Sequence, residues 1–86
     1  MGGMVVDAAT SFGAVLRRLS KAAGLTQKQL ALEADLRRTY VSILELGQQQ
    51  PTLTTILKLA KGLKRPAQEV IGLVEAELQR GSRRRR

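Results

Sequence analysis

Residues 25–53 of this chain read LTQKQLALEADLRRTYVSILELGQQQPTL, and this stretch decides how the 86 residues fold. It contains two short helical patterns separated by a break near Asp35, a residue type that tolerates the left-handed backbone of a tight turn. Thr26 and Gln29 form a capping-box pattern at the start of the first helix, because each side chain can satisfy an end amide of the other residue. The second pattern runs from about 38 to 46. Two such short helices joined by about three residues are typical of a helix-turn-helix unit.

Helical patterns also flank this unit on both sides. A first helix is predicted to begin after Ser11 and to stop at Gly24, a residue type common at helix ends. Thr52 is expected to cap a fourth helix that closes at Leu63, and Pro66 fits the first turn of a fifth. Strand patterns are lacking, since the chain has two aromatic residues and no long alternating run of β-branched residues. The sequence therefore predicts an all-α fold of five helices.

The charge is distributed unevenly along the chain. Fifteen Lys and Arg residues against seven Asp and Glu give a net charge of +8, and five of the basic residues lie in the last seven positions. Such an excess of positive charge favours a polyanionic partner, either nucleic acid or an anionic membrane. Residues 1–79 alone carry a smaller excess of positive charge, which a need for solubility explains equally well. The sequence divides into a flexible segment at 1–10, a helix-turn-helix domain at 11–79, and a disordered arginine-rich tail at 80–86, which is either a native phosphate-binding tail or a remnant of an expression vector.

Several classes of function are disfavoured by composition. The chain contains neither Cys nor His, which excludes zinc sites and most nucleophile–base pairs, so we expect no metal, no cofactor, no small-molecule ligand and no enzymatic activity. No apolar run approaches the ~20 residues that a transmembrane helix needs, so no membrane partner is expected. The N-terminus lacks a signal-peptide pattern, and Val6 stands where a myristoylation motif has Ser or Thr. The expected location is the cytoplasm, in association with the nucleoid if the chain binds DNA.

The spacing of the residues in and around 25–53 resembles the phage-repressor-like (Cro-type, XRE) helix-turn-helix family of bacterial transcription regulators. The resemblance extends from about Phe12 to Ile71. It rests on Gly24-Leu25-Thr26-Gln27, Leu30-Ala31, Leu36, Tyr40, Ser42, Glu45, Gly47 and Pro51. It implies a lambda-repressor-like bundle of five helices whose third helix enters the major groove of double-stranded DNA. It also implies a homodimer that reads an inverted repeat, with half-sites about 34 Å apart.

The outer face of the third helix carries the predicted base contacts. With Tyr40, Val41 and Leu44 packed inward, the opposite face carries polar and apolar side chains that can reach base edges. Arginine pairs bidentately with guanine, and threonine or isoleucine can touch a thymine methyl group. The predicted base contacts are Arg38, Thr39, Ser42 and Ile43. A solvated surface is the alternative for the polar residues, and packing under the following loop is the alternative for Ile43.

Contacts to the DNA backbone are predicted around this helix. Gln27 matches the glutamine that the family places against a phosphate at the start of the second helix. The loop after the third helix commonly carries Lys or Arg in the family, whereas this chain has three neutral glutamines, so a weaker salt dependence is expected. The predicted backbone contacts are Gln27, Lys28, Arg37, Tyr40, Gln48, Gln49 and Gln50.

The chain departs from the family pattern at three positions. Arg37 occupies a helix cap that usually holds Ser, Asp or Asn, and an arginine cannot cap amides. Ser20 replaces an arginine that pairs with the residue matching Glu45, so Glu45 is expected to pair with Arg17 or Lys21 or to be partly exposed. Ile43 replaces a position that is commonly polar, so the target sequence cannot be transferred from a relative.

Apolar residues of the fifth helix are assigned to a dimer interface, with burial in the core of a single chain as the alternative. They are Leu73, Val74 and Leu78. The predicted function is sequence-specific transcription regulation, with repression as the expected mode. Alternatives within this class are the controller protein of a restriction–modification system, which Arg38-Thr39-Tyr40-Val41-Ser42 resembles, and the antitoxin of a toxin–antitoxin pair. A basic protein that coats nucleic acid without sequence preference is the alternative from a different class.

Overall fold

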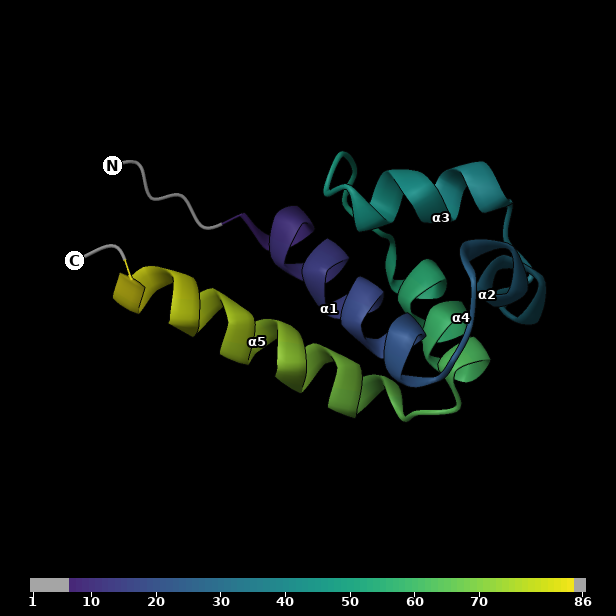
Figure 1. Cartoon of the computed structure of the whole chain (residues 1–86). Coiled ribbons are helices and arrows are strands. Elements are labelled where there is room, and N and C mark those ends of the chain that lie inside the picture. The colour runs from purple at the N-terminus through teal and green to yellow at the C-terminus, as the bar shows by residue number, and fades with distance from the viewer. Residues whose placement is uncertain (1–6, 85–86) are drawn as a thin grey trace.

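The computed structural model describes the backbone of residues 7–84 and the side chains of residues 7–80. Its helices are α1 (Ala8–Ala22), α2 (Gln27–Ala34), α3 (Arg38–Glu45), α4 (Leu53–Leu63) and α5 (Ala67–Arg84), and no strand occurs between residues 7 and 84 (Figure 1). The predicted all-α, five-helix fold is confirmed. None of the helices described between residues 7 and 84 has the length and hydropathy of a membrane-spanning segment.

The turn between α2 and α3 forms as the sequence predicts. Thr26 Oγ1 accepts a hydrogen bond from the Gln29 amide at 3.1 Å, and Gln29 Oε1 accepts one from the Thr26 amide at 2.9 Å. This reciprocal pair is the predicted capping box. Asp35 ends α2 in the left-handed conformation, with φ of 58°. The short turn fixes the angle between the two helices of the helix-turn-helix unit.

Other helix ends follow simple local rules. Gly24 turns left-handed after α1, with φ of 71°, and Thr52 caps α4 by accepting the Thr55 amide at 3.1 Å. Both agree with prediction. Pro66 lies immediately before α5, one position earlier than predicted, and its carbonyl accepts from the following turn. Lys64 was not singled out in the sequence, yet it ends α4 with φ of 60°.

The first helix begins earlier than predicted because Asp7 is its N-cap. The Asp7 carboxylate accepts hydrogen bonds from the Thr10 amide at 3.2 Å and from the Thr10 hydroxyl at 2.6 Å. These two bonds, the hydroxyl bond foremost, hold the pKa of Asp7 below its ordinary value of 3.8. Residues 8–10, assigned in the sequence to a flexible segment, are therefore the first turn of α1.

The fifth helix ends later than predicted. It continues beyond position 79, the predicted end of the folded domain, as far as Arg84. Helix propagation is inexpensive once a helix has been nucleated, and arginine is a good helix former. The backbone of residues 80–84 is thus helical where a disordered tail was expected, and the remaining tail residues 85 and 86 lie outside the described residues.

All five helices contribute side chains to one hydrophobic core. Its largest fully buried members are Leu16, Leu30, Leu44, Leu59, Val15, Val41 and Val70. Val41 and Leu44, which were predicted to face inward, belong to this cluster, and Leu36 and Tyr40 pack against it while remaining partly exposed. The helix-turn-helix unit thus packs against α1 and α4, and α5 in turn packs against these two helices.

Gly13 allows α1 to approach α3 closely. A Cβ atom built at this position would lie 2.5 Å from the Leu44 carbonyl oxygen and 2.7 Å from the Glu45 carbonyl oxygen. No side chain larger than hydrogen fits there without movement of the backbone. The C-terminal turn of α3 is therefore pressed directly against α1, which fixes the position of that helix end.

Candidate DNA-binding interface

Side chains from α2 and α3 meet at the outer face of the helix-turn-helix unit. Gln27, the first residue of α2, lines an open hollow of about 220 Å³ together with Arg38, Thr39 and Ser42 of α3. Arg38 and Thr39 are exposed, while Gln27 and Ser42 are partly buried. The fold thus brings three of the four predicted base contacts beside one predicted backbone contact.

The fourth predicted base contact has a different environment. Ile43 is partly buried and is not among the residues that line the hollow. Leu46, which follows α3, has 61% of its surface exposed. Apolar contact area is therefore available toward the C-terminal end of α3, whereas the hydrogen-bonding groups gather toward its N-terminal end.

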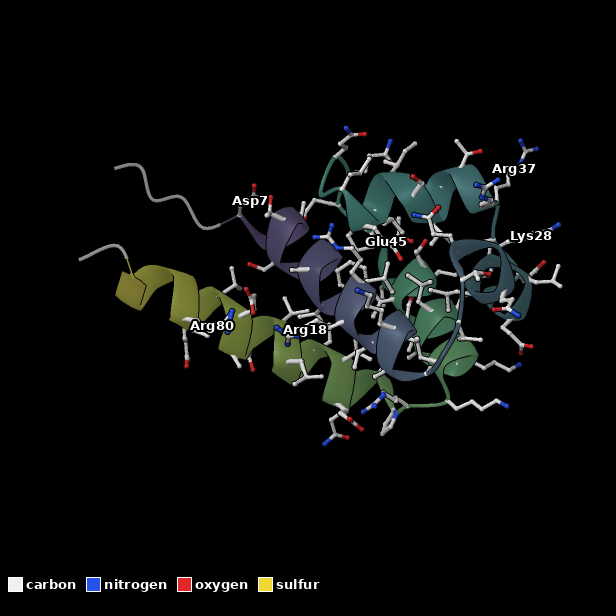
Figure 2. The ribbon with its side chains drawn as sticks, viewed as in Figure 1. Asp7, Arg18, Lys28, Arg37, Glu45 and Arg80 are labelled. Atoms are coloured by element: carbon white, nitrogen blue, oxygen red, sulfur yellow. The ribbon has the colours of Figure 1, made fainter. Side chains whose placement is uncertain are left out.

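Cationic side chains lie beside the hollow. Figure 2 shows Lys28 and Arg37 near the turn between α2 and α3, both directed away from the body of the protein. Together with Arg38 they are exposed, and none of the three takes part in an ion pair among residues 7–80. Arg37 precedes α3 without any side-chain capping bond, as predicted. These cations are available to an anionic partner.

The remaining predicted backbone contacts are positioned differently from one another. Gln48, Gln49 and Gln50 are exposed in the loop that follows α3. Tyr40 instead packs partly against the core, and its hydroxyl lies 3.4 Å from the Thr55 hydroxyl of α4. Tyr40 thus connects α3 with α4, and its contact with DNA stays a prediction.

The expected partners of Glu45 are wrong. Its carboxylate is buried, with 8% of the residue exposed, and its Oε1 accepts a hydrogen bond from Gln27 Nε2 at 2.9 Å. Arg17 and Lys21 are exposed and form no ion pair among the described residues. Figure 2 shows Glu45 on the side of α3 that faces α1. Sequence reasoning missed this bond because it joins side chains 18 positions apart that meet only after folding.

The residues assigned to a dimer interface are largely used within one chain. Val74 is 8% exposed and belongs to the core, so its burial needs no second copy. Leu73 and Leu78 are partly buried and pack against the same core. The exposed large apolar residues of the described part lie elsewhere: Leu32, Leu46, Leu53, Leu57 and Ile71.

Comparison with known proteins agrees with this architecture. Residues 16–70 match the helix-turn-helix family model. Control protein C.BamHI from Bacillus amyloliquefaciens is 44% identical over 54 residues, a match that covers 60% of this chain and 65% of that protein, which is less than two thirds of its length.

Solved structures with the same fold include the restriction–modification controller protein C.AhdI from Aeromonas hydrophila, with 42% identity, a TM-score of 0.70, and coverage of 72% of this chain and 94% of that chain. The clp gene regulator ClgR from Corynebacterium glutamicum is 19% identical with a TM-score of 0.85, over 91% of this chain and 83% of that chain, and this likeness concerns the fold alone. The resemblance noted in the sequence is thereby confirmed. The chain belongs to the helix-turn-helix (XRE-type) family of DNA-binding transcription regulators.

Proposed function

We propose that this protein is the controller of a restriction–modification system and regulates transcription by reading an inverted-repeat operator through α3. Two relatives above 40% identity bear the name of control or controller protein. The single observation that carries the DNA-reading role is the hollow in which Arg38, Thr39 and Ser42 of α3 meet Gln27 of α2. Genes for a nuclease and a methyltransferase beside this gene would support the controller role, whereas a toxin gene would favour the antitoxin alternative.

In this proposal the exposed groups divide into two kinds of contact. Arg38 and Thr39 read base edges, with the guanidinium bidentate to guanine and the threonine methyl against thymine. Lys28, Arg37 and the loop at 48–50 contact the phosphates on either side, which fixes the register of α3 in the groove. Because that loop is neutral, fewer counterions are released than a basic loop would release.

Selection of bound sequences from a random DNA pool tests sequence-specific reading. We expect an inverted repeat with half-sites about one helical turn apart. Mobility shifts at physiological salt then compare the selected operator with random duplex, and equal affinity for both would refute sequence-specific reading and favour a nucleic-acid-coating role.

The base-reading role of Arg38 has its own test. Arg38→Ala should weaken specific binding by about 1–3 kcal/mol and leave nonspecific binding nearly unchanged. Lys21→Ala, which removes an exposed cation from α1 outside both the DNA-binding hollow and the proposed dimer face, is the matched control and should affect both kinds of binding weakly and equally. An equal loss in specific and nonspecific binding for Arg38→Ala would make Arg38 a phosphate contact.

The proposal includes a homodimer, because an inverted repeat is read by two protomers related by a two-fold axis. The dimer face proposed here lies on α4 rather than on the core-facing side of α5. Leu53 and Leu57 are 72% and 52% exposed and four residues apart on one side of the helix. Lys61 on the same side and Glu75 on neighbouring α5 are exposed and unpaired among residues 7–80, so opposite charges suit a self-complementary contact.

Sedimentation of matched leucine variants tests this face. Leu53→Glu combined with Leu57→Glu should convert the dimer to a monomer, because each charge would be placed in an apolar contact. Leu32→Glu, at a leucine of α2 that is 78% exposed, should leave the dimer intact. A dimer that survives the double substitution would place the interface elsewhere.

A further inference from the structure

A buried carboxylate lies directly behind the candidate DNA-binding hollow. Glu45 is 8% exposed and takes part in no ion pair among the described residues. Leaving a buried charge without a partner is costly, so each hydrogen bond that such a group receives matters. The bond it receives from another side chain is the one donated by Gln27 Nε2.

The residue that would ordinarily supply a cation to this carboxylate is small in this chain. Ser20, at the position where the resemblance places an arginine, is 5% exposed, and its hydroxyl has no hydrogen-bond partner among the described residues. Ser20 therefore does not replace the missing partner of Glu45. The neutral side-chain amide of Gln27 donates to Glu45 instead, and this bond holds a side chain that lines the hollow in a partly buried position.

This bond fixes which way the Gln27 amide faces. An amide oxygen turned toward the carboxylate would be repelled, so the Nε2 group must face Glu45. The Nε2 group carries two hydrogens, and the carboxylate takes one of them. The second hydrogen remains available to an acceptor at the hollow that Gln27 lines. Phosphate oxygens of DNA are acceptors of this kind.

We propose that Glu45 is a positioning residue for DNA binding, which holds the Gln27 amide so that its second N–H donates to one DNA phosphate beside the hollow. The inference rests on the proposed DNA-reading function. The bond joins the last residue of α3 to the first residue of α2. It therefore couples the helix that reads bases to the helix that contacts the backbone.

Substitutions at Glu45 that keep or remove the acceptor test this role. Glu45→Met keeps the length of the side chain but removes both oxygens, and we expect operator affinity to fall about tenfold, the loss of one well-placed contact. Glu45→Gln retains an acceptor oxygen and should stay within about threefold of the native protein. Glu33→Ala is the matched control, because it removes an exposed carboxylate from α2 without touching Gln27.

A phosphate-by-phosphate measurement separates positioning from a general structural role. Operators that carry a single neutral methylphosphonate are compared in the native protein, Glu45→Met and Gln27→Ala. Neutralising one particular phosphate should weaken operator binding by the native protein but not by either variant. Neutralising any other contacted phosphate should weaken binding by all three proteins to the same extent. In Glu45→Met and Gln27→Ala, the slope of operator affinity against salt concentration should change no more than it does in Glu33→Ala, because the neutral amide of Gln27 releases no counterions.

The outcomes distinguish this inference from the proposed function. If the native protein does not prefer its selected operator, the proposed function fails. If it does, but Glu45→Met retains the phosphate sensitivity of the native protein, the positioning role is overturned. A uniform loss at all phosphates would also overturn it. Thermal unfolding checks that each variant is folded, and Glu45→Ala, with the same expected result, serves as a second variant.

Discussion

The close approach of α1 to α3 can be measured by adding one methyl group. Gly13→Ala should destabilise the protein, although alanine favours helix by about 1 kcal/mol over glycine. The new Cβ would lie 2.5 Å from the Leu44 carbonyl oxygen, against 3.4 Å for the start of ordinary contact, so the two helices must separate by about 0.9 Å (3.4 minus 2.5). Overpacking of this kind costs about 1–3 kcal/mol, and the upper end applies here because both neighbouring atoms belong to backbone.

The matched control is Gly72→Ala in α5. Its Cβ would meet nothing within 4 Å, so only the gain in helix propensity remains. We expect a net loss of about 2 kcal/mol for Gly13→Ala and a gain of about 0.5–1 kcal/mol for Gly72→Ala. In a domain of this size these values correspond to a Tm about 8–16 °C lower and a few degrees higher, respectively.

Urea unfolding followed by circular dichroism gives both free energies, and operator affinity gives a second readout. Because Leu44 and Glu45 belong to α3, the separation displaces the helix that is proposed to read the operator, so Gly13→Ala should also weaken operator binding. Gly72→Ala should leave binding unchanged. If Gly13→Ala stabilised the protein as much as Gly72→Ala, the close contact between α1 and α3 would not exist.

Three further predictions concern local features. Ser20→Ala should leave the free energy of unfolding unchanged or raise it by up to about 1 kcal/mol, because the buried hydroxyl has no partner; a loss above about 1 kcal/mol in urea unfolding would contradict this. Lys64→Gly should stabilise by up to about 1 kcal/mol, because φ is 60° there, whereas Lys61→Gly within α4 should cost about 1 kcal/mol by the same measurement. The pKa of Asp7 is lowered by its bonds from Thr10, so its stabilising effect is complete above the ordinary value of 3.8 and is lost as pH falls through the lowered pKa. The Tm difference between the native protein and Asp7→Asn should therefore change only below about pH 4, and a change confined to higher pH would refute this assignment.

Features that depend on neighbouring residues were predictable from the sequence. The capping box at Thr26, the left-handed turn at Asp35 and the uncapped start of α3 at Arg37 all involve residues within four positions of one another. The N-cap role of Asp7 was not predicted, because the apolar spacing that indicates the first helix begins only at Phe12. The left-handed end of α4 at Lys64 was not predicted either, because lysine is not the residue type that usually ends a helix in this conformation.

Features that depend on packing were less predictable. The bond between Gln27 and Glu45 requires the angle between α2 and α3, which the residue types alone do not specify. Val74 was assigned to a partner because the sequence gives α5 a broad apolar stripe, and only the packing of α5 shows that the core of one chain buries it. The apolar spacing of α4 also predicts that Leu53 and Leu57 face inward, and this prediction is wrong, because the two side chains are 72% and 52% exposed.

The close contact at Gly13 and the absence of a side-chain cap at Arg37 make the two ends of α3 differ in how firmly they are held. Its C-terminal turn is clamped against α1, while its N-terminal turn has unsatisfied amides in solvent and no side chain to hold them. We therefore expect the first turn of α3, which carries Arg38 and Thr39, to fray before its last turn and to show the faster amide hydrogen exchange of the two. In the proposed function, base reading would then coincide with the ordering of that turn, and part of the selectivity for the correct operator would come from this ordering on the DNA surface.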